Sequence, residues 1–244
     1  MKNEIIFAKV KENIDDLVNK NVCWSVPVTH EQIEAYVHCR KPPESIFMPP
    51  GEWLDCEMKG KEVLCLASGG GQQGPLFAAL GARVTVFDLS SNMLDKDKSV
   101  ACRENLSIQI EQGNMYDLSR FRDEKFDIII NPPSLMYVPD VLPVFRECYR
   151  VLKKQGTFIM CAPNPINFIC EYDEELQQHI ACNTLPYKSY EHTNQGDWIE
   201  YGHTLDNYIG GQIGVGFILT GFYENKCNDV ESDFVTRAIK PPLC

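Results

Sequence analysis

The sequence KEVLCLASGGGQQG, at residues 61–74, decides the fold of this chain. Val63 to Ala67 is a short apolar run, which is typical of a strand that is buried on both faces of a parallel sheet. Gly69 to Gly71 then allow a tight turn and a close approach of the backbone to a ligand, because glycine has no Cβ atom. Gln72 to Leu80 is predicted to form a helix, with its N-terminal N–H groups and its dipole facing that ligand.

A second apolar strand, Arg83 to Phe87, is predicted to end at Asp88. An acid at the end of this strand, about 20 residues after the glycines, commonly accepts hydrogen bonds from ribose hydroxyls. Strand, glycine turn, helix, strand and acid together predict a nucleoside half-site, a more specific signal than an isolated GxGxxG. The alternative is an ordinary βαβ turn in which Asp88 only caps the next helix.

The chain after Asp88 continues to alternate between helices and strands. Ser90 is a plausible N-cap for the first helix of this part. The order predicts a doubly wound parallel sheet with right-handed crossovers. The expected elements are a helix at Ser91 to Glu104, strands at Ser107 to Glu111 and Phe126 to Ile130, a helix at Val141 to Leu152 with a turn at Gln155-Gly156, and a strand at Thr157 to Ala162.

The last part of the chain has a different pattern. Two strands, Ile218 to Lys226 and Phe234 to Lys240, are joined by about seven residues, too few for a crossover helix, so they must be antiparallel. A helix at Leu205 to Phe217 precedes them. We therefore predict an α/β, doubly wound, Rossmann-like sheet of seven strands, mostly parallel with an antiparallel C-terminal hairpin strand, and an N-terminal helical extension.

Two segments are predicted to lie outside this regular pattern. Residues 1–55 are expected to form a lid segment, with an amphipathic helix at Asn3 to Lys20, a short helix near Glu31 to His38 and a proline-rich run. Residues 56–244 would form the main domain. Within it, residues 163–203 form an irregular insertion, with a helix inside Asn164 to Ala181 and a strand at Leu185 to His192.

Composition narrows the class of protein. The chain has 244 residues, which fits one α/β domain with additions. Its 23 Lys+Arg and 34 Asp+Glu give a net charge of -11, which disfavours a nucleic-acid partner. The 11 cysteines contain no CxxC pair, and no signal peptide, membrane span or metal-binding pattern is apparent. We expect a cytoplasmic protein with reduced thiols. The oligomeric state is not predicted.

On these residues the chain resembles the class I S-adenosylmethionine-dependent methyltransferases. LCLASGGGQQGPLFAALGARVTVFDLS, at residues 64–90, corresponds to their nucleotide loop, with Gly69 and Gly71 in place but Cys65 and Ala67 where the pattern has an acid and its first glycine. FRECYRVLKKQGTFIM, at residues 145–160, resembles the passage after their fourth strand. The SGGGQQG loop, VPD and GHTLDNYIGGQIGVGFILTGFYE are similar to a group of small bacterial-type enzymes, mostly without assigned substrates.

The resemblance implies S-adenosylmethionine as cofactor. It implies that Asp88 binds the ribose, that Leu89 contacts the adenine, and that Asn114 and Met115 hold the adenine edge and face. The whole implied cofactor set is Ser68, Gly69, Gly70, Gly71, Gln73, Asp88, Leu89, Ser90, Met93, Asn114, Met115 and Asn131.

The methyl acceptor is expected to be a small molecule of unknown identity. Methyl transfer from a sulfonium requires alignment and exclusion of water more than acid–base groups, so no catalytic residue is assigned. Candidates for the acceptor pocket are Trp24, Tyr137 and His203, with His30 behind them, although a structural role is favoured for each. The insertion adds further polar groups at Tyr187, Tyr190, His192 and Tyr201.

Asn131-Pro132-Pro133-Ser134 resembles the Asn/Asp-Pro-Pro-aromatic motif of amino-group methyltransferases. Because Ser134 replaces the aromatic residue, we interpret this motif as a rigid turn beside the methyl site. Binding of an amine acceptor there is the less favoured alternative.

Two other functions fit parts of the pattern. Gly69 to Gly74 spells GxGxxG, and Asp88 is spaced correctly for NAD, as in a dinucleotide oxidoreductase. The chain has no second mononucleotide half and no Tyr-x-x-x-Lys site, which speaks against that class. The Cys65 and Ala67 departures also permit a non-catalytic protein that binds S-adenosylmethionine.

Overall fold

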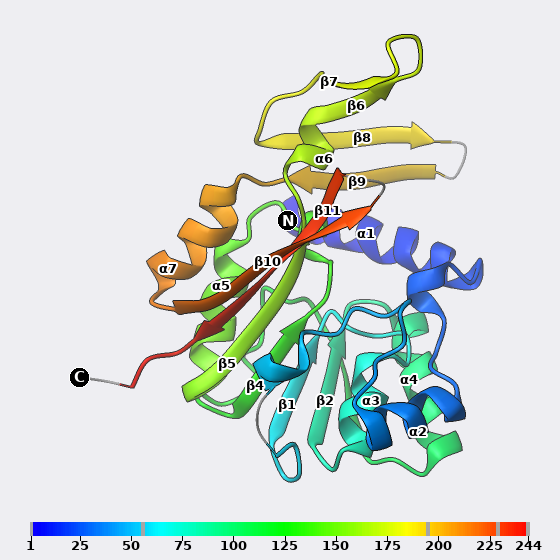
Figure 1. The fold of residues 1–244 in the computed structure, drawn as a ribbon, viewed down its shortest axis with the longest axis vertical. Helices are drawn as coiled ribbons and strands as arrows, with labels where there is room; N and C mark the ends of the chain where they lie inside the picture. Colours follow the sequence, from blue (N-terminus) through cyan, green and yellow to red (C-terminus); the bar gives the residue numbers. More distant parts are fainter. Residues whose placement is uncertain (1, 55–56, 194–195, 228–229, 243–244) are drawn as a thin grey trace.

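The computed structural model describes residues 2–54, 57–193, 196–227 and 230–242. A seven-stranded sheet in the order β10-β11-β5-β4-β1-β2-β3 forms its centre (Figure 1). β1 to β5 are parallel, and β11 is antiparallel to both β5 and β10, which confirms the predicted fold class. The strands are β1 (Glu62–Leu66), β2 (Arg83–Asp88), β3 (Ile108–Gln112), β4 (Phe126–Asn131), β5 (Leu152–Pro163), β10 (Ile218–Cys227) and β11 (Val230–Ile239).

Helices cover both faces of the sheet (Figure 1). Leu64 and Leu66 of β1 pack in a cluster with side chains of α1 and α5, whereas Val63 and Cys65 pack in a second cluster with side chains of α3 and α4. This double burial explains the continuous apolar runs of the strands. The helices are α1 (Lys2–Asn19), α2 (His30–Cys39), α3 (Gln73–Ala79), α4 (Ser91–Glu104), α5 (Leu142–Val151), α6 (Ile166–Ile169) and α7 (Gly211–Val215), with a π-helical turn η4 (Asp206–Gly210) before α7 and short 3-10 turns at η1 (Cys23–Ser25), η2 (Gly51–Leu54) and η3 (Leu135–Tyr137).

Two strands begin earlier than predicted. β5 starts at Leu152, and Gln155, expected in a turn, lies within the strand with a φ of 62°. Its N–H donates to the carbonyl of Lys240, so pairing with the end of the chain extends the strand. β11 starts at Val230 instead of Phe234 because its first, largely polar residues also pair with β10.

The insertion folds mainly as two hairpins above the carboxyl end of the sheet (Figure 1). The predicted strand near Leu185 is present as β8 (Tyr187–Thr193), and the predicted helix is limited to the four residues of α6. Three further strands were not predicted, namely β6 (Cys170–Asp173), β7 (Gln178–Ala181) and β9 (Gly196–Gly202). β6 and β7 contain no buried residue, so they lack the apolar alternation by which strands are recognised.

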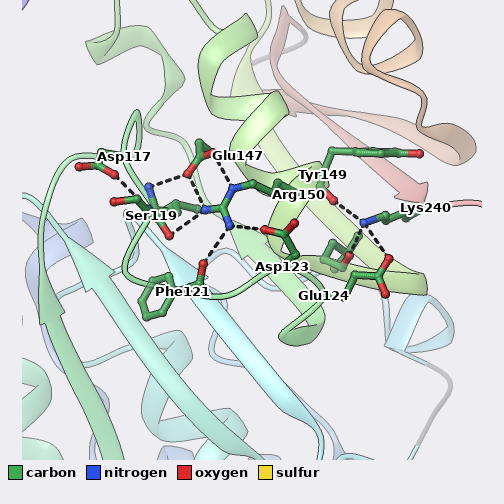
Figure 2. A network of polar contacts seen from close by, with 11 residues as sticks. Asp117, Ser119, Phe121, Asp123, Glu124, Glu147, Tyr149, Arg150 and Lys240 are labelled. Atoms are coloured by element: carbon green, nitrogen blue, oxygen red, sulfur yellow. Dashed lines mark hydrogen bonds and ion pairs between the residues drawn. The ribbon is translucent and has the colours of Figure 1, made fainter.

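The edge of the sheet where β4 begins is held by two cations (Figure 2). The Arg150 guanidinium contacts the carboxylates of Glu147 and Asp123 and donates to the carbonyls of Leu118 and Phe121, at 2.7–2.9 Å. Lys240 Nζ donates to the carbonyls of Tyr149 and Leu152, each at 2.9 Å. These bonds tie the end of α5 to the loop before β4 and to the C-terminal strand.

In the described part of the chain, no helix has the length and apolar character that a membrane crossing requires.

Candidate active site

A cavity of about 340 Å³ lies where β1, β2, β3 and β4 end. The residues that follow each of these strands line it, namely Ala67 to Gly69, Leu89, Gly113 to Met115 and Pro132 to Ser134. Asp88, the last residue of β2, also faces it. The opposite wall comes from the N-terminal segment and the turn after β4, through Phe7, Val10, Ile14, Trp24, Ser45, Phe47, Met136, Tyr137 and Val138.

The carboxyl group of Asp88 is fixed at the rim of this cavity. Its Oδ2 accepts a hydrogen bond from the N–H of Gly69 at 2.9 Å, and its Oδ1 accepts one from the N–H of Ser90 at 2.9 Å. The residue is only 6% exposed. Burial raises the pKa of Asp88, and the backbone N–H groups oppose that rise. Ser90 Oγ also accepts from the N–H of Met93 and thus caps α4, as the sequence predicted. The same hydroxyl contacts Asp15 of α1.

A second buried carboxyl group, that of Asp97 in α4, lies behind the glycine loop. Its Oδ2 accepts hydrogen bonds from the N–H groups of Gly70 and Gly71, at 2.9 and 3.0 Å. Its Oδ1 is buried and has no hydrogen-bond partner in the described structure. Burial, together with the nearby negative charge of Asp88, raises the pKa of Asp97 to about 8. Asp97 was not predicted as a site residue, because DKDKS, at residues 95–99, has the appearance of an exposed helix face.

The three glycine N–H groups of the loop therefore all donate to carboxyl oxygens. A loop that cradles the pyrophosphate of a dinucleotide must offer its N–H groups to the anion. Here they are already bonded to the carboxyl groups of Asp88 and Asp97. The loop as folded therefore leaves none of these three N–H groups free for the pyrophosphate of NAD.

The two glutamines after the glycines attach the N-terminal segment to the loop. Gln72 Nε2 donates to the carbonyl of Val26 at 2.9 Å, and Gln73 Nε2 donates to the carbonyl of Phe47 at 3.0 Å. Gln73 Oε1 in turn accepts from Ser68 Oγ at 2.8 Å. The glutamines therefore fix the position of the segment that contributes Trp24, which is 37% exposed, to the cavity wall.

The Asn131-Pro132-Pro133-Ser134 segment forms a closed turn. Asn131 Nδ2 donates to the carbonyl of Leu66 at 2.9 Å and to Ser134 Oγ at 2.8 Å. The prolines and Ser134 line the cavity, but Asn131 itself does not. Its Oδ1 is buried without a hydrogen-bond partner among the described residues. The turn thus sets the floor of the cavity beside the end of β1.

His203 supports the cavity wall from behind. Its Nε2 lies 3.2 Å from the carbonyl oxygen of Leu135 and 2.9 Å from that of Val138, at the two ends of η3. Burial lowers the pKa of His203, and these carbonyls oppose the change. Tyr137, between them, lines the cavity, and burial raises the pKa of its phenol. His30 is remote from this arrangement, since it forms an exposed pair with Glu104 at 2.8 Å.

The structure brings most of the sequence-predicted residues to one cavity. Trp24 and Tyr137 line it, together with these members of the implied cofactor set: Ser68, Gly69, Gln73, Asp88, Leu89, Met93, Asn114 and Met115. Gly70, Gly71, Ser90, Asn131 and His203 lie outside the lining, in contact with residues that form it or hold it. Tyr201 is buried, Tyr187 is partly buried, and the side chains of Tyr190 and His192 are outside the described part.

Comparisons with known proteins agree with this arrangement. Residues 64–160 match the methyltransferase domain family. The uncharacterized methyltransferase YbaJ of Bacillus subtilis is 42% identical over 208 residues, which span 78% of this chain and 80% of that protein. A ubiquinone biosynthesis O-methyltransferase of Haemophilus ducreyi is 33% identical over 109 residues, 43% of this chain and 46% of that protein.

Solved structures share the fold. The S-adenosylmethionine-dependent methyltransferase of Mesorhizobium loti has a TM-score of 0.64 and 19% identity, covering 77% of this chain and 94% of its own. One from Methanosarcina mazei has a TM-score of 0.61 and 18% identity, covering 80% and 98%. Together with the long match to the Bacillus protein, these findings show that the chain belongs to the class I S-adenosylmethionine-dependent methyltransferases and is an enzyme with S-adenosylmethionine as its cofactor.

Proposed function

We propose that the enzyme binds S-adenosylmethionine in the 340 Å³ cavity. The methyl acceptor would be a small molecule that lies against the wall formed by the N-terminal segment. The observation that supports this most is that a single cavity joins the glycine loop and Asp88 to α1, Trp24 and Tyr137. Asp88 would accept hydrogen bonds from the ribose, while Leu89, Asn114 and Met115 enclose the adenine. Ser68 and Gly69 would contact the remainder of the cofactor.

Four further residues of the implied set would act from behind the cavity lining. Gly70 and Gly71 supply the shape of the loop through their positive φ angles of 108° and 71°. Ser90 orients Asp88 through its N–H, and Asn131 holds the turn after β4 against β1. Gln73 and Met93 complete the side of the cavity next to α3 and α4.

The proposed acceptor is small and largely apolar. The acceptor end of the cavity is formed by Phe7, Val10 and Ile14 of α1 and by Met136 and Tyr137, and the whole cavity is near the lower limit of about 300–1,000 Å³ for ligand pockets. The net charge of -11 disfavours a nucleic acid. When bound, the cofactor supplies an electrophilic methyl group. The apolar walls would orient the acceptor and exclude water, and no residue is assigned as a general base.

The contacts of the N-terminal segment with the cavity and with the insertion also support a division of the chain into two parts. We infer that residues 1–55 form a cover and residues 56–244 the methyltransferase domain, although the boundary itself falls at residues 55–56, outside the described part. The insertion supports the cover, since Ile199 and Tyr201 of β9 share a core cluster with Ile6, Phe7 and Val10 of α1. The buried free thiols of Cys65, Cys148 and Cys161 suit a reducing cytoplasm.

Calorimetric titration with S-adenosylhomocysteine tests the proposal. The wild type should bind one ligand per chain, and Asp88→Ala should lose about 1–3 kcal/mol of binding free energy, because a charged acceptor of two hydroxyl groups is removed. Asp95→Ala is the matched control, since Asp95 is an exposed acid of α4. Equal affinities in all three proteins would overturn the assignment of the cavity. Release of S-adenosylhomocysteine in a screen of small metabolites and of nucleic acids tests the acceptor class.

A further inference from the structure

Among the described residues, two buried acids lie beside the cavity, Asp88 and Asp97. The proposed binding mode gives a role to Asp88 but none to Asp97. Asp97 is 0% exposed and contacts two successive N–H groups of the glycine loop, at 2.9 and 3.0 Å. These are the glycines with positive φ, and both are tightly enclosed. A Cβ at Gly71 would lie 2.9 Å from Val100 Cγ2, and one at Gly70 would lie 3.0 Å from Met93 Cε.

We propose that Asp97 is a positioning residue that holds the glycine loop in the shape that receives the cofactor. Two N–H groups that share one carboxyl oxygen fix the orientation of two consecutive peptide planes. The N–H that precedes these two in the loop, that of Gly69, donates to Asp88. Asp97 therefore sets the position of Gly69 relative to Asp88, and both of these residues line the cavity. This inference rests on the proposed binding of the cofactor in that cavity.

Removing the carboxyl group would leave the buried N–H of Gly71 without its acceptor and the N–H of Gly70 with only the carbonyl of Met93, at 3.0 Å, a change that costs free energy unless the loop moves. A moved loop would displace Ser68 and Gly69 from the cavity wall. An asparagine has the same shape, and its Oδ1 can accept both N–H groups without carrying a charge. The positioning role therefore predicts that Asp97→Asn keeps cofactor affinity and that Asp97→Ala loses it.

Among the residues that the structure describes, no lysine, arginine or histidine forms an ion pair with Asp97. The ionisable groups that face it are Asp88 of β2 and the thiol of Cys65 in β1, and α3, which approaches it at Gly74, has no ionisable side chain. A pKa of about 8 places its proton exchange close to neutral pH. A cationic cofactor favours the ionised form, so its binding should release a proton, whereas the product lacks the sulfonium charge.

Calorimetry on the full-length enzyme tests this role, at a temperature well below the melting point of each variant. For S-adenosylhomocysteine we expect at least a tenfold loss of affinity in Asp97→Ala, less than a threefold loss in Asp97→Asn, and no change in the exposed control Asp95→Asn. Wild-type affinity in folded Asp97→Ala, with a loss in Asp88→Ala, would overturn the role of Asp97 and leave the proposed site intact. Unchanged affinity in both variants would overturn both proposals.

The pH dependence of cofactor affinity tests the role of Asp97 even if Asp97→Ala does not fold. The affinities for S-adenosylmethionine and S-adenosylhomocysteine are compared between pH 6.5 and 9 in the wild type and in Asp97→Asn. In the wild type, the preference for S-adenosylmethionine should rise several-fold as the pH increases through 8, because ionised Asp97 favours the cation. In Asp97→Asn this preference should be constant. Equal pH dependence in both proteins would contradict the proton release, and a loss of affinity of tenfold or more in folded Asp97→Asn would overturn the positioning role.

Discussion

The two ends of the parallel strands, which form two opposite edges of the central sheet, differ in whether their charged side chains have partners of opposite charge. Where β4 begins, Arg150 contacts two carboxylates and two backbone carbonyls, and Lys240 contacts the carboxylate of Glu124 and two backbone carbonyls (Figure 2). Where β1 and β2 end, Asp88 and Asp97 accept only backbone N–H groups, and no lysine or arginine of the described structure contacts either. An ion pair with both partners present stabilises a fold modestly, whereas an unpaired buried acid costs stability. The carboxyl end of the sheet therefore carries a cost in stability that the opposite end avoids.

The largest effect that separates the two edges should be the pH dependence of stability. The pKa of Asp97 is about 8 in the folded protein and about 4 in the unfolded chain, so the folded state binds more protons between these values. Its contribution to stability is therefore complete below pH 4 and is lost as the pH rises to 8. Asp97→Asn lacks this loss and should gain on the order of 5 kcal/mol relative to the wild type across that range.

Urea unfolding at several pH values between 4 and 8 measures this difference. Asp95→Asn serves as the control, because Asp95 is exposed on the same helix and its free energy of unfolding should follow that of the wild type. If the curves of the wild type and Asp97→Asn run parallel over this range, Asp97 is not a buried acid with a raised pKa.

A smaller effect is expected at the opposite edge. Arg150→Ala removes the donor of two backbone carbonyls and the partner of two carboxylates, and should lower the free energy of unfolding by about 2–3 kcal/mol. Its affinity for S-adenosylhomocysteine should equal that of the wild type. Arg146→Ala is the matched control, an exposed arginine of α5 that should change stability by less than about 0.5 kcal/mol. A cofactor-binding defect in Arg150→Ala would show that the edges are coupled.

The smallest of these effects concerns Ser90, at the junction of α4, Asp88 and α1. Ser90→Ala removes the N-cap of α4 and the contact with Asp15, and should lower stability by about 1 kcal/mol. Cofactor affinity should change less than threefold, because Asp88 is held by the backbone N–H of residue 90. Thermal unfolding compared with Ser99→Ala, which alters an exposed hydroxyl in the same helix, measures the effect. A loss of affinity as large as that of Asp88→Ala would mean that the hydroxyl itself orients the acid.

The fold was predictable where the signals are local. α4 has the predicted bounds because Ser90 caps its start and Asn105, in the left-handed conformation, ends it. The central strands were evident from their apolar runs. The Gln155-Gly156 pair has turn chemistry, however, and its place in β5 depends on Lys240, a partner far along the chain.

The candidate site was predictable for the same reason only in part. Asp88 follows a strand at a recognisable spacing, so the sequence indicates its place. Asp97 lies among charged residues of a helix, and its burial depends on where the glycine loop folds over it. His203 reaches carbonyls 65 and 68 residues away, a distance over which sequence patterns give no information about contact.

The packing of α1 against β9 affects the order in which the protein is made and folded. Ile6, Phe7 and Val10 leave the ribosome early, yet they pack in a cluster that contains Ile199 and Tyr201. The helix must remain without its complete partner surface until the insertion has been synthesised, and contacts so distant in sequence form slowly. The α1 side of the cavity lacks this support until Tyr201 has been made. We expect the cavity to reach its final shape, and with it full affinity for the cofactor, only after that point in synthesis.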